Sequence, residues 1–325
     1  MCRDAVINMK IVVLDGFAVN PGDLSWDFFK KYGEIEVFDK TPDSECAQKC
    51  VGATAVYTNR CKITAELLDA CPTVKYVSAL GTGFDMIDIE ACKARGVAVV
   101  NIPAYSTASV AQLTIQFLLA LHANLDGMQG IVKDGMWTGI PGYQYQRVPF
   151  TELEGLTLGL IGCGNIGGRV AAAASALGMN ILAHTAHHHE DTDIIKYVPL
   201  DTLLNKADAV SLHCPLNDST RGLVDAAFIA KMKDGARLIN TSRGAVLNER
   251  DVADALNSGK LAGAALDVLA NEPALPENPL LKAKNCIITP HIAWASKASR
   301  KRLLAVLDAS MDNFVKTGVG LNRIV

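Results

Sequence analysis

Short runs of apolar and β-branched residues recur along the chain, and more polar segments with helical spacing separate them. Runs that are apolar throughout, rather than alternating, are typical of strands buried on both faces of a parallel sheet. Five such runs lie in the first third of the chain, at residues 10–16, 35–39, 53–59, 74–80 and 97–103. Six more follow residue 150, at residues 157–162, 180–185, 207–214, 236–242, 262–268 and 286–292. The pattern predicts an α/β protein with two doubly wound parallel sheets.

The segments between these runs have the composition of helices, and several close on glycine, a common C-terminal stop. They are expected at residues 63–70, 87–96, 167–178 and 248–259. A longer apolar helix is expected at 109–125, followed at 135–149 by an irregular stretch rich in Gly, Tyr and Pro. Such a stretch is typical of an arm, lid or interface. The last helix, at 296–318, is amphipathic, and its packing partner cannot be read from the pattern.

Length and composition describe an ordinary globular protein. The 325 residues, half of them hydrophobic and one fifth charged, leave room for roughly two domains. A net charge of −3 gives no reason to expect nucleic acid or an anionic membrane as a partner. The first eight residues precede the first predicted strand, and we expect them to be a loose leader or to lie before an alternative start at Met9.

The cysteines and the apolar segments both bear on the cellular compartment. The nine cysteines are scattered singly and none has zinc-ligand spacing, so we expect free thiols in a reducing compartment and no metal. We find no apolar segment of the length of a signal peptide core or a membrane span. The expected location is the cytoplasm.

A glycine-rich turn joins the strand predicted at 157–162 to an alanine-rich helix. Its sequence, GCGNIG at residues 162–167, has the spacing of a dinucleotide-binding loop. The first glycine permits the turn, the second lets the backbone approach a pyrophosphate, and the third lets helix and strand pack closely. The helix N-terminus then presents N–H groups to the anion. A tight strand-to-helix turn without a ligand is the alternative.

Three residues whose side chains are suited to catalysis or substrate binding follow strands of the second set. Arg243 follows the strand at 236–242, Glu272 follows the one at 262–268, and His291 ends the last one. Ligands of an open α/β sheet bind at these carboxyl ends. Taken singly, each has a structural explanation: a surface salt bridge, a solvated charge or a core histidine.

Together the three residues suit the reduction of a 2-oxo acid by a nicotinamide cofactor. Hydride delivered to the keto carbon leaves an alkoxide that needs a proton, and histidine changes its charge near neutral pH. A carboxylate beside the histidine keeps it protonated and oriented. A guanidinium grips a carboxylate and a keto oxygen with two prongs, which lysine cannot do.

The motifs GCGNIG, NTSRG, ALDVLANEP and PHIAW, in this order and spacing, resemble the D-isomer-specific 2-hydroxyacid dehydrogenase family. The resemblance extends from about Met9 to the end of the chain. The segments MKIVVLDGFAVNPGDLSW and NIPAYSTASVAQLTIQFLLALH are further similar to its glycerate dehydrogenase (hydroxypyruvate reductase) branch.

The resemblance implies a domain organisation. A flavodoxin-like substrate-binding domain would comprise residues 1–106 and 295–325, and a Rossmann dinucleotide-binding domain residues 107–294. The active site would lie in the cleft between them. The helix and arm at 109–149 would form the interface of a homodimer.

The resemblance also implies roles for single residues. Arg243 would bind the substrate, His291 would be the general acid/base, and Glu272 would support His291. The N–H groups of Thr82 and Gly83 match the loop that holds the substrate carboxylate, with a simple glycine turn as the alternative.

Further positions match the family's substrate pocket and cofactor site. Trp294 would shape the substrate pocket, unless it only packs at a strand end. Asp267 matches the residue facing the nicotinamide carboxamide, and Thr107 a polar residue near the ring. The cofactor-contacting set comprises Thr107, Gly162, Gly164, Asn165, Ile166, Gly167, Thr185, His187, His213, Cys214, Pro215, Thr220, Thr241, Ser242 and Asp267.

The end of the strand at 180–185 departs from the family pattern. An acid there usually binds both ribose hydroxyls of NAD and repels the 2′-phosphate of NADP. Here Thr185 takes that place, and His187, His188 and His189 follow. The histidines either face the phosphate or form a solvated loop, and adjacent histidines point apart, which disfavours zinc. Both NAD(H) and NADP(H) remain open.

The expected activity is the interconversion of a 2-oxo acid and a D-2-hydroxy acid, with hydroxypyruvate or glyoxylate as the substrate. D-lactate and 3-phosphoglycerate dehydrogenases are alternatives within the family. Formate dehydrogenases of the superfamily carry Gln in place of Glu272, which argues against them. The alternative from another class is a dinucleotide-sensing co-repressor, which the complete Arg243, Glu272 and His291 set disfavours.

Overall fold

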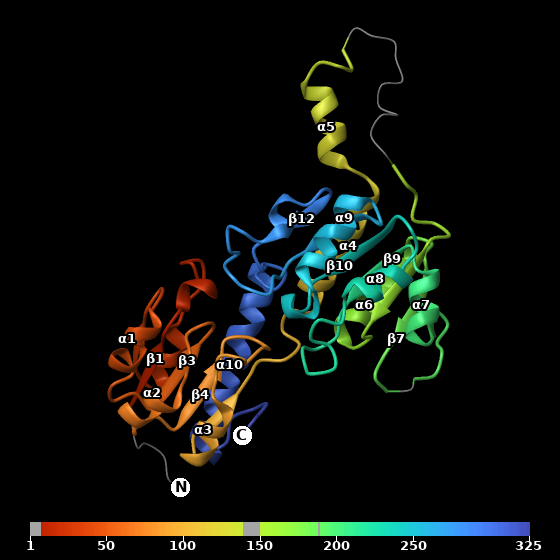
Figure 1. Cartoon of the computed structure of the whole chain (residues 1–325). Helices are drawn as coiled ribbons and strands as arrows, with labels where there is room; N and C mark the ends of the chain where they lie inside the picture. Colours follow the sequence, from red (N-terminus) through yellow and green to blue (C-terminus); the bar gives the residue numbers. More distant parts are fainter. Residues whose placement is uncertain (1–7, 139–149, 188) are drawn as a thin grey trace. The chain divides into compact units, whose positions relative to one another are not determined.

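The computed structural model describes residues 8–138, 150–187 and 189–325 (Figure 1). Most of the irregular stretch expected at 135–149, the leader before Asn8, and His188 therefore lie outside the described residues. The chain divides into two compact units. The first comprises Met1–Ser106 and Ala295–Val325, and the second comprises Thr107–Trp294.

The first unit contains a five-stranded sheet in the order β2-β1-β3-β4-β5, and all its strand pairs are parallel. This is the flavodoxin-like strand order. The strands are β1 (Met9–Val13), β2 (Gly33–Val37), β3 (Ala55–Thr58), β4 (Tyr76–Ala79) and β5 (Ala98–Val100). The helices are η1 (Gly16–Ala18), η2 (Asp27–Lys31), α1 (Asp43–Lys49), α2 (Ala65–Ala70), α3 (Ile89–Ala94) and α10 (Lys297–Thr317).

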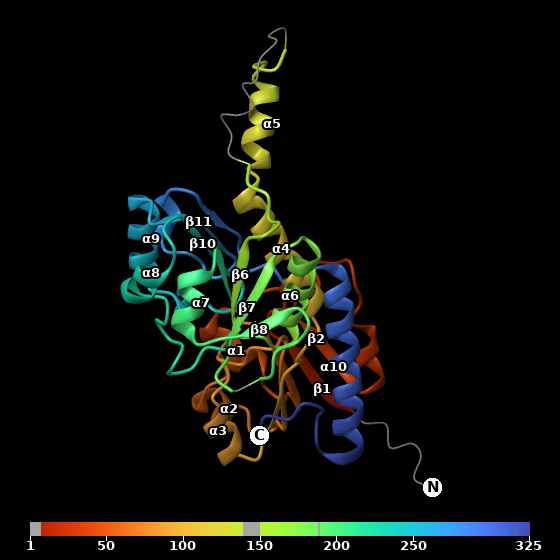
Figure 2. The ribbon, with the colours of Figure 1, turned by 90° about the vertical axis from the view of Figure 1, so that its right-hand side faces the viewer.

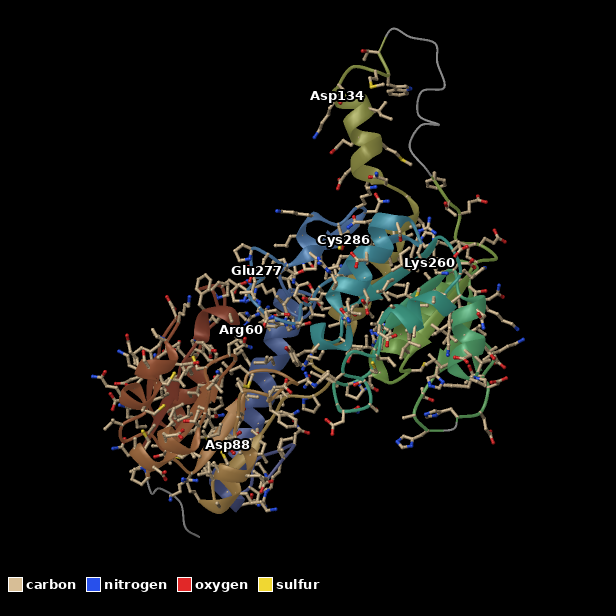
Figure 3. All side chains as sticks on the ribbon, in the orientation of Figure 1. Arg60, Asp88, Asp134, Lys260, Glu277 and Cys286 are labelled. Atoms are coloured by element: carbon tan, nitrogen blue, oxygen red, sulfur yellow. The ribbon has the colours of Figure 1, made fainter. Side chains whose placement is uncertain are left out.

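Both faces of this sheet are covered. Helices α1, α2 and α3 bury residues such as Cys46, Leu67 and Cys92 in one core with alternate residues of the strands. Capping side chains start two of these helices, for example Asp88, which accepts the N–H of Ala91 at 2.9 Å at the start of α3 (Figure 3). The opposite face carries α10, so the chain returns to the first unit after the second is complete.

Aromatic side chains connect α10 to the sheet. The ring of Tyr76 on β4 lies 4.7 Å from that of Phe314, and its hydroxyl lies 2.9 Å from Ser310 Oγ. Tyr76 also contacts Tyr57 of β3, with ring centroids 5.8 Å apart. Because both tyrosines are fully buried, this face of the sheet requires a covering helix, and the buried side of α10 supplies it.

The second unit contains a seven-stranded parallel sheet in the order β12-β11-β10-β9-β6-β7-β8. Its strand order reverses between β6 and β9, the switch point at which such sheets bind ligands. The strands are β6 (Thr157–Ile161), β7 (Asn180–His184), β8 (Ile195–Tyr197), β9 (Ala209–Leu212), β10 (Ala236–Asn240), β11 (Leu261–Leu266) and β12 (Cys286–Ile288).

Helices cover both faces of the second sheet (Figure 2). On one face α4 (Thr107–His122) and α6 (Asn165–Ala176) share a core that includes Leu118 and Val170. On the other, α7 (Leu200–Lys206), α8 (Ala226–Lys231) and α9 (Glu249–Ser258) form a second core. The short helices η4 (Gly244–Val246) and η5 (Pro279–Lys282) lie in loops, and α5 (Leu125–Lys133) has no buried residue.

The predicted architecture of two parallel α/β units is confirmed, and each predicted apolar run overlaps a strand. The last strand, β12, ends at Ile288, so His291 lies in the turn after it and not at the end of the strand. Strand β8 and helices α1, α7 and α8 were not predicted, because they are short and carry no extended apolar run. The helix predicted at 109–125 ends at His122 instead. Asn124 accepts the N–H of Gly127 at 2.9 Å and starts α5. Of the helices described, none has both the length and the apolar character needed to cross a membrane.

Candidate active site

The glycine loop between β6 and α6 is tightly packed on one side and open on the other. Gly162 has φ +89°, and a Cβ there would lie 2.8 Å from the carbonyl carbon of His213. A Cβ on Gly167 would lie 2.6 Å from the carbonyl oxygen of Gly162. A Cβ on Gly164, the N-cap of α6, would meet nothing within 4 Å.

This arrangement suits a dinucleotide. Asn165 and Ile166 form the first turn of the twelve-residue helix α6, whose N–H groups have no partner within the helix. The partial positive charge of the helix N-terminus and the open space at Gly164 together form a cradle for a pyrophosphate. The glycine loop therefore fits the cofactor that the sequence predicted.

The segment after β9 lies directly against this loop. A Cβ on Gly162 or on Gly167 would lie 2.8 or 3.7 Å from atoms of His213, and Nε2 of His213 lies 2.9 Å from Ser211 Oγ. Burial lowers the pKa of His213 to about 4, so the ring is neutral near pH 7. Thr220 closes the turn that follows, donating to the carbonyl of Pro215 at 2.6 Å. Cys214, between them, is buried. The structure thus brings this predicted segment and the glycine loop together.

At the end of β7 the Thr185 hydroxyl is used within its own loop. It donates to the carbonyl of His187 at 2.6 Å, while the side chain of His187 is exposed. The ring of His189 stacks on Tyr197 of β8 with centroids 5.1 Å apart. The N–H of Gly162 in the glycine loop donates to the carbonyl of His184, the residue before Thr185, at 2.8 Å. Thr185 and His187 are therefore neighbours beside the glycine loop, and no acid lies on β7.

Asn240, which the sequence analysis did not select, shapes the turn that carries Arg243. Its Oδ1 accepts the N–H of Ser242 at 2.9 Å and the Ser242 hydroxyl at 2.8 Å. Its Nδ2 donates to the carbonyl of Arg243 at 2.9 Å. Thr241 is tied to α4, the helix that begins at Thr107, through a 3.0 Å contact with the Thr114 hydroxyl. These polar groups of the turn are therefore paired locally.

Gly244 connects this turn with the loop that leads to Glu272. A Cβ at Gly244 would lie 1.9 Å from the carbonyl carbon of Leu269 and 2.3 Å from the nitrogen of Ala270. Only glycine allows the two backbones to approach this closely. The contact places the segment after Arg243 against the segment before Glu272. The glycine in NTSRG was visible in the sequence, but its contact partner was not.

The carboxylate of Glu272 faces the imidazole of His291, with 2.7 Å between Oε2 and Nδ1. The other oxygen, Oε1, accepts the N–H of Leu269 at 3.1 Å. Both side chains are partly exposed, at 29% for His291 and 23% for Glu272, which leaves room for a ligand to reach them. The acid–base pair expected from the sequence is therefore assembled within the second unit.

Asp267 is bonded to residues on both sides of His291 and is almost completely buried. Its carboxylate accepts the hydroxyl of Thr289 and the N–H groups of Ile292 and Ala293. Burial raises the pKa of Asp267, and these hydrogen bonds oppose the shift. Trp294 follows directly and is partly buried.

The predicted carboxylate-binding loop lies in the first unit, directly after β4. The Thr82 hydroxyl donates to the carbonyl of Ile102 at 2.9 Å, and Nδ2 of Asn101 donates to the carbonyl of Thr82 at 2.7 Å. Asn101 is buried and thereby holds the loop that contains Thr82 and Gly83. Asn101 was also missed by the sequence analysis, because the segment that begins with it was compared with the family as a whole and no role was assigned to this residue.

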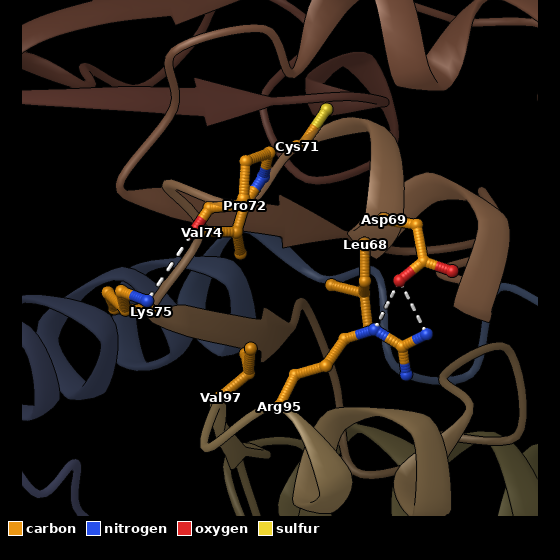
Figure 4. Close-up of a pocket in the computed structure, with 8 residues that line it drawn as sticks. All are labelled: Leu68, Asp69, Cys71, Pro72, Val74, Lys75, Arg95 and Val97. Carbon is orange, nitrogen blue, oxygen red and sulfur yellow. Dashed lines mark hydrogen bonds and ion pairs between the residues drawn. The ribbon is translucent and has the colours of Figure 1, made fainter.

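A hollow of about 280 Å³ in the first unit lies away from these residues (Figure 4). It is found at the amino ends of β4 and β5, where Val74 and Val97 precede the strands. Arg95 spans it and donates to Asp69 Oδ1 at 2.6 and 2.8 Å. Active sites of parallel sheets occur at the carboxyl ends of strands, so this hollow is not the candidate site.

Comparisons with known proteins agree with the motifs. The model of the family described as "D-isomer specific 2-hydroxyacid dehydrogenase, NAD binding domain" matches residues 115–293. A hydroxypyruvate reductase from Blautia hydrogenotrophica is 44% identical over 313 residues, which are 95% of this chain and 97% of that protein.

Two solved structures share the fold over nearly the whole chain. A D-lactate dehydrogenase from Aquifex aeolicus, complexed with NAD and lactic acid, has a TM-score of 0.81 at 30% identity. The match covers 97% of this chain and 99% of that protein. An NADPH-dependent glyoxylate/hydroxypyruvate reductase from Sinorhizobium meliloti, in complex with NADP and malonate, has a TM-score of 0.82 at 26% identity. The match covers 98% of this chain and 97% of that protein.

Proposed function

The chain belongs to the D-isomer specific 2-hydroxyacid dehydrogenase family, and on that premise we propose that it is a hydroxypyruvate reductase, interconverting hydroxypyruvate and D-glycerate. The observation that carries this proposal is the 2.7 Å contact of His291 with Glu272. The loop before Glu272 packs closely against Gly244, which follows Arg243 directly. The similarity to the Blautia hydrogenotrophica enzyme supports the choice of substrate.

The chain's own residues supply the proton and the binding groups. A nicotinamide dinucleotide, when bound, supplies the hydride that the keto carbon of the substrate accepts. Since Glu272 holds Nδ1 of His291, we assign Nε2 as the nitrogen that donates the proton to the former keto oxygen. The carbonyl thereby becomes a hydroxyl. The negative charge of Glu272 stabilises the imidazolium before the transfer and orients the ring throughout.

Arg243 and the loop at Thr82 and Gly83 are assigned to the substrate's anionic groups. The guanidinium binds the carboxylate and the keto oxygen through a two-pronged contact. Backbone N–H groups of Thr82 and Gly83 bind the carboxylate, and the support of that loop by Asn101 favours this role. Trp294, directly after the turn of His291, is assigned to the wall of the substrate pocket.

The residues that would hold the cofactor surround the glycine loop. Gly162, Gly164, Asn165, Ile166 and Gly167 would bind the pyrophosphate. Thr107 and the segments after β9 and β10 would line the remainder of the cofactor site. The residues of these two segments are His213, Cys214, Pro215, Thr220, Thr241 and Ser242. The absence of an acid on β7 removes the repulsion that excludes a 2′-phosphate. We therefore propose that the chain accepts both NADH and NADPH.

We further propose that two copies of the chain pair through the α5 region. Helix α5 has no buried residue, and large apolar side chains around it are exposed: Leu125 by 73%, Val132 by 48%, Trp137 by 62% and Phe150 by 67%. An apolar patch of this kind marks an interaction surface. Sedimentation analysis tests this, since Trp137→Asp should shift a dimer toward the monomer. The eight cysteines described are free thiols, which supports a reducing compartment, the cytoplasm.

The activity is tested by following cofactor oxidation with purified protein and hydroxypyruvate, with NADH and NADPH measured side by side. We expect turnover with both cofactors, and slower turnover with glyoxylate. Rapid turnover of another 2-oxo acid with little on hydroxypyruvate would change the substrate assignment within the family. Tight cofactor binding without turnover of any 2-oxo acid would contradict the enzyme proposal and support a dinucleotide-sensing protein.

A further inference from the structure

The turn at Thr289–Ala293, which carries His291 after β12, has an unusual backbone. His291 has φ +55°, a left-handed conformation that is strained for any residue other than glycine. The N–H of His291 donates to the carbonyls of Asp267 and Thr289 at 2.8 and 2.9 Å. A backbone in this state persists only where its surroundings hold it.

The hydrogen bonds that hold this turn involve one carboxylate, that of Asp267. Oδ1 of Asp267 accepts the hydroxyl of Thr289 at 2.5 Å and the N–H of Ile292 at 2.9 Å. Oδ2 accepts the N–H of Ala293 at 2.9 Å. The carboxylate thus bonds to residues on both sides of His291. Because Asp267 is only 1% exposed, these bonds form away from competing water and are stronger than at the surface.

Asp267 also connects this turn with the turn of Arg243. Its N–H donates to the carbonyl of Asn240 at 2.9 Å, and Asn240 in turn binds the carbonyl of Arg243. A continuous series of hydrogen bonds therefore connects the backbone of His291, the proposed proton donor, with the backbone of Arg243, the proposed substrate-binding residue.

We propose that Asp267 and Thr289 are positioning residues, which lock the turn at 289–293 so that the imidazole of His291 faces the carboxylate of Glu272. The role of Asp267 is then to place the proton donor rather than to bind the nicotinamide carboxamide. This inference rests on the proposed function for its effect on catalysis, but the hydrogen bond it explains can be measured in the protein alone.

The Thr289 hydroxyl offers a matched pair of variants. Thr289→Ser keeps the hydroxyl, whereas Thr289→Val keeps the size and branching and removes it. An imidazole N–H that is hydrogen-bonded to a carboxylate gives a strongly deshielded proton signal in the NMR spectrum, and the signal of His291 is assigned by its loss in His291→Gln. We expect this signal in the wild type and Thr289→Ser, and expect it to be broadened or absent in Thr289→Val and Asp267→Asn.

The catalytic rate should fall in the same variants that lose the His291 N–H signal. Misplacing a reacting group by about 1 Å costs up to about 10²-fold in rate, so we expect Thr289→Val and Asp267→Asn to lose about 10- to 100-fold in kcat. The Kd of NADH, measured by its fluorescence, should stay within about twofold, and Thr289→Ser should restore most of the rate.

Two results would overturn the inference. An unchanged N–H signal and rate in Thr289→Val would show that the turn does not depend on these bonds. A loss of NADH binding in Asp267→Asn as large as its loss of rate would assign Asp267 to the cofactor instead. If Asp267→Asn does not fold, the comparison of Thr289→Val with Thr289→Ser decides alone. If the wild type reduces no 2-oxo acid, the proposed function fails while the NMR comparison still tests the turn.

Discussion

Nδ1 of His291 lies 2.7 Å from Oε2 of Glu272, although nineteen positions separate the two residues in the chain. Glu272 follows β11 and His291 follows β12, two neighbouring parallel strands. The pair forms because the carboxyl ends of parallel strands meet at one edge of the sheet. With its second oxygen bound to the N–H of Leu269, the carboxylate is fixed from two sides and can orient the ring.

The charge of this carboxylate is tested by Glu272→Gln, which keeps the size of the side chain. Without the negative charge the side chain no longer attracts the imidazolium that donates the proton, so reduction of the 2-oxo acid should slow. We expect kcat to fall at least about tenfold. The measurement is kcat for hydroxypyruvate, with Glu277→Gln, an exposed acid five positions further on, as the control. An equal kcat for the wild type and Glu272→Gln would refute the role of the charge.

Arg243→Lys tests the two-pronged contact with the substrate. Lysine keeps the positive charge but cannot present two parallel N–H groups. Losing a charge-assisted hydrogen bond costs roughly 1.5–3 kcal/mol, so we expect kcat/KM for hydroxypyruvate to fall about 10- to 100-fold. The Kd of the cofactor should not change. The exposed Arg250, changed in the same way, is the control. A variant with wild-type kcat/KM would remove Arg243 from the substrate site.

Two glycines of the α6 region separate a binding effect from a folding effect. A Cβ meets no neighbouring atom within 4 Å at either Gly164 or Gly168, so alanine fits the protein at both positions. Only Gly164 lies at the proposed pyrophosphate cradle. We expect Gly164→Ala to weaken NADH binding at least about tenfold, since a methyl group would stand where the phosphate approaches.

The control, Gly168→Ala, lies within the helix. It should bind NADH normally and raise stability by about 0.5–1 kcal/mol, the usual gain from alanine over glycine in a helix. Thermal unfolding and fluorescence titration of both variants give the answer. Equal NADH affinity in the two would place the cofactor elsewhere.

The acid stability of the first unit should depend on Asp23. Arg300 binds this carboxylate at 2.6 and 2.9 Å, and mainly this hydrogen bond lowers the pKa of Asp23 from 3.8 to about 2. A lowered pKa means that the folded state favours the ionised form. The stabilisation is therefore complete above about pH 4 and is lost as the pH falls toward 2.

Urea unfolding of the wild type and Asp23→Asn at several pH values tests this dependence. The wild type should be more stable than Asp23→Asn at pH 7, and the difference should shrink between pH 4 and pH 2. A difference that stays constant over this interval would show that the charge of Asp23 contributes nothing.

The sequence predicted those parts of the site that rest on local motifs. GCGNIG predicted a strand, a turn and a helix at residues that indeed form β6 and α6. Arg243, Glu272 and His291 could be selected because each follows an apolar strand, and the ends of parallel strands share an edge. The strand order of both sheets agrees with the predicted architecture.

What could not be predicted depends on contacts between distant segments. The fit of Gly244 against Leu269 joins two loops, and the bonds of Asp267 to Thr289, Ile292 and Ala293 require the turn to be folded already. Likewise, the amphipathic pattern of α10 indicates a buried face, but not that Tyr76 of the first unit lies beneath it. Patterns give local periodicity, whereas packing partners depend on the whole fold.

The most direct test of the account compares hydroxypyruvate reduction by the wild type and by His291→Gln, together with NADH affinity. If His291 donates the proton, the wild type turns over and the variant loses at least about 10²-fold in kcat, while its Kd for NADH stays within about twofold. Turnover by His291→Gln at the wild-type rate would contradict the account.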